Sequence, residues 1–206
     1  MTRVIIMAGG EGRRWNNYLG VPKHLIVIDG ETLLARQIRQ LRERGIDDIT
    51  ICGPYEIEGT KRLDPRDNTQ AMEFELVDRG LAEGRVIVLL GDVYYTDHAM
   101  DVICAQKPDK DITWVDRLRA GNTWDRWGEL WAIVIDGAYE QICQAIGETR
   151  NTREIMPKVK RALGKPLESI EVNDETSDFD WPVVYLSWMS RRKAYAFRAA
   201  HAKRRR

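Results

Sequence analysis

The chain has 206 residues, of which 43% are hydrophobic, and its 32 basic residues balance 32 acidic ones. This length suits one domain with a substantial core, and no apolar run approaches the roughly 20 residues of a membrane-spanning helix. No signal peptide is evident at the N-terminus, and the three separated cysteines form neither a CxxC pair nor a zinc set. We therefore expect a cytoplasmic protein with reduced cysteines.

Apolar segments alternate with helical patterns through the first half of the chain. Segments typical of buried strands or extended chain lie at 4–7, 23–28, 48–52 and 85–90. Helical spacing of apolar residues covers 32–44 and 69–81. Gly45 is placed to end the first of these helices, and Asp29-Gly30 predicts a turn. The segment RVIVLL at 85–90 is apolar after its arginine, which is typical of a central parallel strand.

The second half of the chain continues both patterns. Strands are expected at 111–115, 130–135 and 169–172, and helices at 138–146, 152–163 and 182–202. The alternation predicts an α/β fold with a doubly wound, mostly parallel sheet, in a single domain over 1–206. Ligands of such sheets bind at the carboxyl ends of the strands. The loops after Met7 and Leu90 are therefore the candidate sites.

Basic residues gather at the end of the chain. The segment 190–206, SRRKAYAFRAAHAKRRR, has no acidic residue, so the rest of the chain is net acidic. Such a tail can bind phosphates or nucleic acid. The solvated face of a basic C-terminal helix over 182–206 is the simpler interpretation, because a helix C-terminus favours cations. One short basic run favours the simpler interpretation.

The loop after the first strand, AGGEGRRWNNYLGVPK, is rich in glycine and cations. It is not a dinucleotide fingerprint, because Trp15 stands where the third glycine of GxGxxG is required. A Walker A loop would need Gly-Lys followed by Ser or Thr, which is absent. Glycines let backbone N–H groups approach phosphate oxygens, and nearby cations neutralise them. This composition favours a nucleoside triphosphate as the ligand.

The same loop resembles the signature of the nucleotidyltransferases that activate sugar phosphates and similar phosphates. That signature is Ala-Gly-Gly-x-Gly-Thr-Arg-Leu, followed by Pro-Lys. The matching residues are Ala8, Gly9, Gly10, Gly12, Arg14, Pro22 and Lys23. Arg13 stands where Thr or Ser is usual, and Trp15 where Leu or Met is usual. The alternative is an unrelated α/β domain whose glycine loop carries surface arginines.

The resemblance implies a Rossmann-like, GT-A-type nucleotidyltransferase fold and gives the loop residues their roles. The glycine backbone and Arg13 would cradle the nucleotide. Arg14 would hold the β- and γ-phosphates, and Lys23 would contact the α-phosphate.

Two acidic segments fit a Mg²⁺ site. Asp92 follows the strand 85–90, and a carboxylate at the carboxyl end of a strand can bind a hard cation. By resemblance, a Gly-Asp here supplies one magnesium ligand. The segment NDETSDFDWPVVY at 173–185 is similar to the family's Asp-x-Asp-Thr-Pro-Glu-Asp, with Trp181 replacing Thr. It implies Asp180 as the second ligand and Asp178 as an assisting ligand. Helix capping by these carboxylates is the alternative.

Candidate pockets for the base and the acceptor rest mainly on the resemblance. Asn68 and Thr69 would approach the base or the sugar, and Gln70 a base edge, although helix capping explains the first two equally well. The segment 111–135, with four tryptophans, would build a small acceptor lobe, with Glu129 as the candidate acceptor-binding residue. A packed lobe or a dimer interface would use these indoles equally well. Asp116 and Arg126 are further candidates in this segment.

Together these features predict a Mg²⁺-dependent nucleotidyltransferase that joins the nucleoside monophosphate of an NTP to a phosphorylated acceptor and releases pyrophosphate. A sugar phosphate is the expected acceptor. Because the attacking phosphate is already anionic, positioning and electrostatics are sufficient and no general base is needed. A homodimer remains an open alternative to a monomer.

Two other functions stay open. One is a GT-A-type glycosyltransferase, although the Asp-x-Asp usual after its central strand is absent, since Val93-Tyr94 follows Asp92. The other is a non-catalytic protein that binds nucleotide or nucleic acid.

Overall fold

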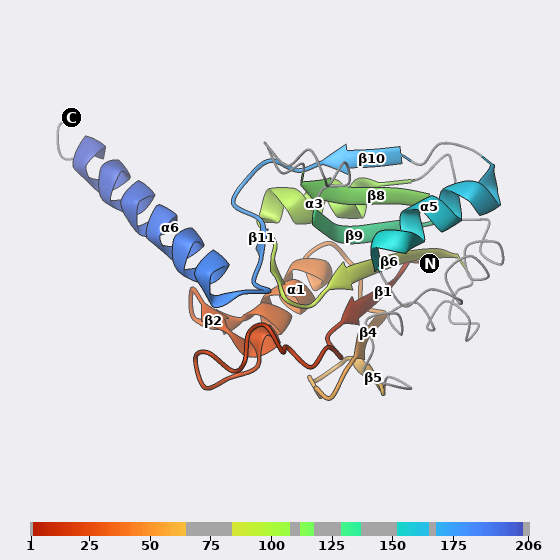
Figure 1. The fold of residues 1–206 in the computed structure, drawn as a ribbon, viewed down its shortest axis with the longest axis horizontal. Helices are drawn as coiled ribbons and strands as arrows, with labels where there is room; N and C mark the ends of the chain where they lie inside the picture. Colours follow the sequence, from red (N-terminus) through yellow and green to blue (C-terminus); the bar gives the residue numbers. More distant parts are fainter. Residues whose placement is uncertain are drawn as a thin grey trace.

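A central sheet of seven strands organises the protein (Figure 1). The computed structural model describes residues 2–64, 84–107, 112–117, 129–136, 152–164 and 168–203. In their order across the sheet, the strands are β10 (Glu168–Glu171), β8 (Ile112–Arg117), β9 (Glu129–Ile135), β6 (Arg85–Leu90), β1 (Thr2–Met7), β4 (Ile49–Cys52) and β5 (Lys61–Leu63). Only β9 is antiparallel to its neighbours, and all the other pairs are parallel. The predicted α/β fold with a mostly parallel sheet is therefore confirmed.

The central pair of strands, β1 and β6, sets the position of everything at one edge of the sheet. Their register runs from Thr2 opposite Arg85 to Met7 opposite Leu90. Side chains on both faces of this pair are buried, which explains why both sequences are continuous apolar runs. Because the two strands end side by side, the segments that follow Met7 and Leu90 leave the sheet together.

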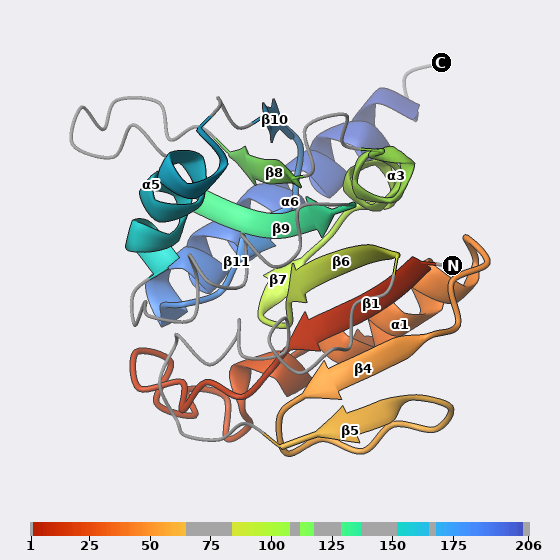
Figure 2. The same ribbon diagram turned by 90° about the vertical axis from the view of Figure 1, so that its right-hand side faces the viewer.

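Helices cover both faces of the sheet. They are α1 (Leu33–Arg42), α3 (Asp97–Ala105), α5 (Thr152–Leu163) and α6 (Pro182–Lys203). Figure 2 shows α1 and α3 on one face and α5 on the other. Helix α1 begins where the Thr32 hydroxyl accepts a hydrogen bond from the Ala35 N–H at 3.2 Å. Gly45, which the sequence predicts to end this helix, follows it with a left-handed φ of 72°.

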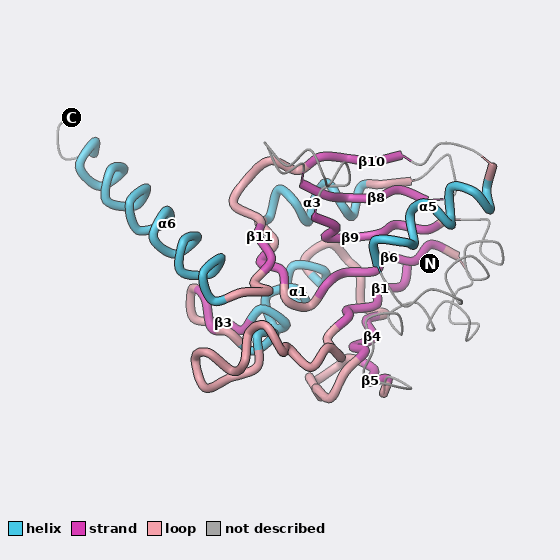
Figure 3. The backbone as a smooth tube through the Cα atoms, viewed as in Figure 1, coloured by secondary structure: helices cyan, strands magenta, loops and turns pink. Residues whose placement is uncertain are grey.

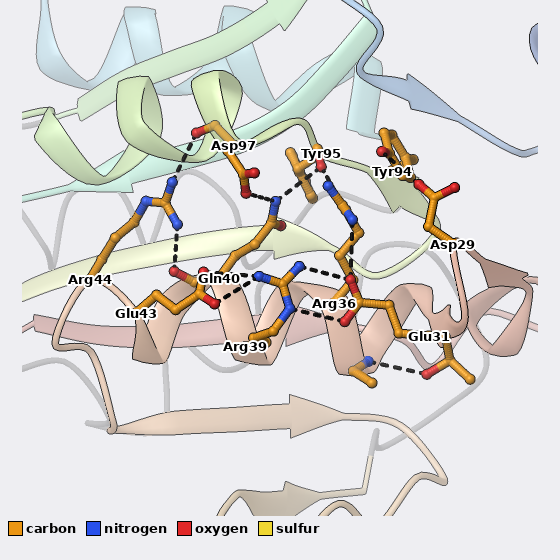
Figure 4. Close-up of polar contacts among 12 residues, drawn as sticks. Asp29, Glu31, Arg36, Arg39, Gln40, Glu43, Arg44, Tyr94, Tyr95 and Asp97 are labelled. Carbon is orange, nitrogen blue, oxygen red and sulfur yellow. Dashed lines mark hydrogen bonds and ion pairs between the residues drawn. The ribbon is translucent and has the colours of Figure 1, made fainter. Parts of the chain in front are cut away.

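Polar side chains of α1 fix the irregular segment that follows β6. The Gln37 amide donates to the carbonyls of Leu90 and Val93 at 3.1 and 2.9 Å. Gln40 and Arg36 donate to the Tyr95 carbonyl at 3.2 and 3.1 Å (Figure 4). Carbonyl groups that are shielded from water need such partners. Helix α1 therefore holds in place the segment that contains Asp92.

Helix α6 projects away from the sheet on the side where β1 and β6 end (Figures 1 and 3). Its first turns dock through a second apolar cluster, separate from the main core. This cluster consists of Trp15, Ile26, Ile28, Leu33, Tyr94, Phe179 and Trp188. The Trp188 indole also donates to the Glu175 carbonyl at 2.7 Å, and Arg192 lies over its ring at 4.8 Å.

Most of the predicted elements agree with the structure, including the helix over 152–163 and the closing helix. The segment 23–28 differs, because Lys23–Leu25 forms a 3-10 helix, η1, before the short strand β2 (Val27–Ile28). That strand pairs with β3 (Glu31–Thr32), so the Asp29-Gly30 turn is confirmed. Further elements that the sequence did not indicate are β5, β7 (Val93–Tyr94), α3 and β11 (Ser177–Asp178).

Other predictions lie partly or wholly outside the described residues. The expected helices over 69–81 and 138–146 lie outside them, as does the middle of the expected acceptor lobe. The two ends of that segment are β8 and β9, which belong to the central sheet. The acceptor lobe and the single domain over 1–206 therefore stay predictions. Among the described residues, no helix has the length and apolar character needed to cross a membrane.

We expect Trp188→Ala to lower the free energy of unfolding by about 3–5 kcal/mol, because it removes a large buried side chain that docks α6. Urea unfolding followed by far-UV circular dichroism measures the change. Leu186→Ala is the control, since Leu186 lies on the same helix but is 47% exposed. Equal midpoints for the two variants would show that this face does not dock the helix.

Candidate functional site

The glycine loop after β1 is held against the end of β4. The Ala8 N–H donates to the Cys52 carbonyl at 2.8 Å, and a Cβ at Gly53 would lie only 2.5 Å from the Ala8 carbonyl oxygen. Gly12 has the left-handed φ of 59° and accepts a hydrogen bond from the Asn16 N–H at 2.8 Å. A Cβ at Gly10, in contrast, would meet nothing within 4 Å. The space around Gly10 is therefore open and is not filled by neighbouring protein atoms.

Trp15 anchors the far side of this loop in the second apolar cluster. Its side chain is 1% exposed, and its indole N–H donates to the Val21 carbonyl at 2.9 Å. Tyr18 and Tyr185 pack edge-on against its ring, with centroids 5.6 and 5.8 Å away. Trp15 therefore fixes the backbone of its neighbours.

Arg13 and Arg14 remain exposed on this loop. Arg13 pairs with Glu11, also at the surface.

Four charged side chains from three distant parts of the chain meet beside the loop. The Lys23 ammonium contacts the carboxylate of Asp92 and lies 2.9 Å from Asp180 Oδ1. The other oxygen of Asp180 accepts from Arg14 Nη1 at 2.6 Å. Two carboxylates and two cations thus form one charge-balanced cluster, which we call the charge quartet. The structure thus links four of the five residues for which the sequence predicts catalytic or metal-binding roles, all but Asp178.

Tight backbone contacts bring Asp92 and Asp180 together. The N–H of Gly91 donates to the Met7 carbonyl at 2.8 Å, and a Cβ at Gly91 would lie 2.8 Å from that same oxygen. Glycine is therefore required immediately before Asp92. Farther along, the Phe179 N–H donates to the Asp92 carbonyl at 3.1 Å, and β11 pairs with β7. These contacts bring the segment around residue 180 to the end of β6.

Burial and charge act in opposite directions on the ionisation of the quartet. Burial alone would lower the pKa of Lys23, but the carboxylates of Asp92 and Asp180 outweigh it and raise that pKa above its ordinary value. Burial alone would raise the pKa of Asp92, but the Lys23 ammonium outweighs it and lowers that pKa. Both groups are therefore charged at neutral pH.

The two carboxylates of the quartet are of the chemical type that could hold a Mg²⁺ ion. Two carboxylates converge on one small cationic group, the Lys23 ammonium. Magnesium is usually held by one or two carboxylates together with substrate phosphates. Among the described residues, no group of three or more His, Cys, Asp or Glu side chains could hold a metal alone. The expected third ligand, Asp178, is buried within β11, and its role stays a prediction.

Most of the residues predicted to bind the base and the acceptor are not among those that the structure describes. Asn68, Thr69 and Arg126 lie outside the described residues, as does Gln70. Glu129 begins β9, and the register of Leu89 opposite Ala132 puts that start at the edge where β6 ends. The acceptor-binding role of Glu129 stays a prediction.

His24 lies next to the site, although the sequence indicated no special role for this residue. It is buried next to Lys23, and its Nδ1 lies 3.1 Å from the Tyr55 hydroxyl. A Cβ at Gly91 would also approach its ring at 3.2 Å. Burial lowers the pKa of His24 to about 4. His24 is therefore a neutral packing residue beneath the quartet. In the sequence, the one sign that His24 lies at the site is its position next to Lys23.

Comparison with known proteins identifies the class. Residues 4–117, more than half of the chain, match the family model described as a MobA-like NTP transferase domain. The protein is therefore a nucleotidyltransferase. It belongs to the MobA-like NTP transferase family, which favours the nucleotidyltransferase interpretation over the glycosyltransferase and the non-catalytic protein. Comparison with curated proteins gives no match.

Solved structures share the fold over nearly the whole chain. The CTP:phosphocholine cytidylyltransferase of Streptococcus pneumoniae is 21% identical, with 90% of this chain and 96% of that chain covered and a TM-score of 0.59. The inositol-1-phosphate CTP transferase of T. maritima is 15% identical, with 92% and 95% covered and a TM-score of 0.64. Rv0371c of Mycobacterium tuberculosis is 14% identical, with 92% and 97% covered and a TM-score of 0.65. At these identities the likeness shows the fold alone.

We expect His24 to make the protein less stable as the pH falls from about 6.5 to about 4. In this window the unfolded chain binds a proton that the folded protein excludes, so the loss approaches about 3 kcal/mol at the acid end. His24→Gln should remove this contribution and flatten the dependence of unfolding free energy on pH. Urea unfolding at several pH values measures it.

The matched control is His98→Gln, because His98 is exposed on α3. A pH dependence in His24→Gln as steep as that of the unmodified protein would contradict a buried, neutral His24.

Proposed function

We propose that the protein transfers a nucleoside monophosphate from an NTP to a phosphorylated small molecule and releases pyrophosphate, with Mg²⁺ as the cofactor. The observation that supports this most directly is the charge quartet at the carboxyl ends of β1 and β6, beside an open glycine loop. Ligands of open α/β sheets bind at this edge. The proposal needs neither a second copy of the chain nor nucleic acid.

In the proposed reaction, an oxygen of the acceptor phosphate attacks the α-phosphorus of the NTP. The bond from that phosphorus to the bridging oxygen breaks, and pyrophosphate leaves with the electron pair. Lys23 would orient the α-phosphate, and Arg14 would take up charge on the departing pyrophosphate. Asp92 and Asp180 would hold Mg²⁺, which neutralises charge on the triphosphate when bound. No proton has to be removed, because the attacking phosphate oxygen is already anionic.

A sugar phosphate is the acceptor we favour, from the resemblance in the sequence and the family membership. Two proteins of the same fold are named for phosphocholine and inositol-1-phosphate. A test of the acceptor therefore needs phosphorylated alcohols as well as sugar phosphates.

The direct test is pyrophosphate release with Mg²⁺, with each common ribonucleoside triphosphate and dTTP combined with a panel of these acceptors. We expect release that needs one triphosphate and one acceptor. Asp92→Asn and Arg14→Ala should each lower the rate by about 10²–10³-fold, as expected for loss of one electrostatic contact to the transition state. Asp101→Asn is the control, because Asp101 is exposed on α3. Full activity in Asp92→Asn would overturn the proposed site.

Lys23→Met should have two opposite effects. Turnover should fall, because a cation at the α-phosphate is lost. In the absence of nucleotide, however, Mn²⁺ should bind at least about tenfold more tightly, because the ammonium that pairs with both carboxylates is removed. Electron paramagnetic resonance of free Mn²⁺ measures this binding directly.

Lys61→Met is the matched control, because Lys61 pairs with Asp48, which is not part of the quartet. Unchanged or weaker Mn²⁺ binding in Lys23→Met, with the protein still folded, would show that Asp92 and Asp180 are not the metal ligands.

A further inference from the structure

Arg14 has a second neighbour besides Asp180. Its guanidinium carbon lies 5.9 Å from the centroid of the Trp181 ring. Trp181 is 51% exposed, so its indole contributes little to the core. Of the two aromatic departures from the family signature, Trp15 is buried in the second apolar cluster, and Trp181 is the one that lies beside the Arg14 guanidinium.

The backbone of Trp181 is fixed although its side chain is exposed. Its carbonyl accepts from the N–H groups of Val184 and Tyr185 at 3.0 and 3.3 Å, which begins α6. Two residues earlier, Phe179 is fully buried and packs against Tyr185 and Trp188, with ring centroids 5.3 and 5.2 Å away. The indole therefore projects from a hydrogen-bonded backbone segment whose neighbour Phe179 is packed in the second apolar cluster.

The Arg14 side chain needs such support because it is itself 51% exposed. A long side chain in water loses conformational entropy when a ligand fixes it. Asp180 can orient the guanidinium in the free protein, but in the proposed function that carboxylate would hold Mg²⁺. An indole face attracts a guanidinium without occupying its N–H donors, so the donors stay available for phosphate oxygens.

We propose that Trp181 is a positioning residue that holds the Arg14 guanidinium in place for the terminal phosphates. This inference rests on the proposed function, since it assumes that Arg14 binds the β- and γ-phosphates. It adds to the site a residue that the sequence showed only as a departure from the family pattern.

The test is a double-mutant cycle that measures the binding of inorganic pyrophosphate with Mg²⁺ by titration calorimetry. Trp181→Leu should weaken binding by about two- to fivefold, as expected for an exposed cation–π contact. Trp181→Phe, which keeps an aromatic face, should restore most of this loss. In an Arg14→Gln background, Trp181→Leu should have no further effect. Val183→Ala, at a neighbouring exposed position, is the matched control and should bind as the unmodified protein does.

The outcomes separate the inference from the function on which it rests. Binding that Trp181→Leu leaves unchanged, or weakens equally with and without Arg14, would overturn the positioning role while leaving the proposed function intact. An unmodified protein that binds no pyrophosphate and turns over no substrate pair would overturn both. Once the substrates are known, a rise in KM for the acceptor rather than for the NTP in Trp181→Leu would also overturn the role, because it would place the indole against the acceptor.

Discussion

The site depends on one ammonium group shared between two carboxylates. Lys23 pairs with Asp92 and Asp180, which lie 88 residues apart in sequence and would repel each other without a cation between them. Carboxylates largely shielded from water are stabilised by pairing with a cation and by hydrogen bonds. The lysine therefore joins three segments: the end of the glycine loop, the end of β6 and the turn before α6.

Packing beneath the quartet puts these charges within reach of one another. Met7 and Leu90 end their strands side by side, and the close approach of Gly91 to the Met7 carbonyl leaves Asp92 at the strand ends. Apolar burial supplies the free energy that holds this frame, and the hydrogen bonds from Gln37 hold the carbonyls on either side of Asp92. The packing of the apolar sheet thus determines where the charged side chains of the quartet lie.

The difference between the apolar sheet and the polar segments beside it explains what the sequence could and could not predict. The apolar runs at 4–7 and 85–90 are long enough to reveal parallel strands, and with them the loops that carry the site. Strands β7 and β11 have two residues each, too few to show a period, so the pairing that brings Asp180 to Asp92 could not be foreseen. Nor could the sequence tell that Trp15 is buried and Trp181 exposed, since tertiary contacts alone decide this.

The balance of charge in the quartet has a consequence for how the proposed substrates bind. Two carboxylates and two cations sum to zero in the free protein. A metal ion that arrived alone would displace Lys23 and Arg14 from their partners and leave a surplus of positive charge. A triphosphate that arrived alone would draw these cations away and leave Asp92 and Asp180 unpaired, one of them largely buried. If the two arrived together, the metal ion would pair with the carboxylates while Lys23 and Arg14 paired with phosphate oxygens, so the quartet favours a nucleotide already complexed with its metal.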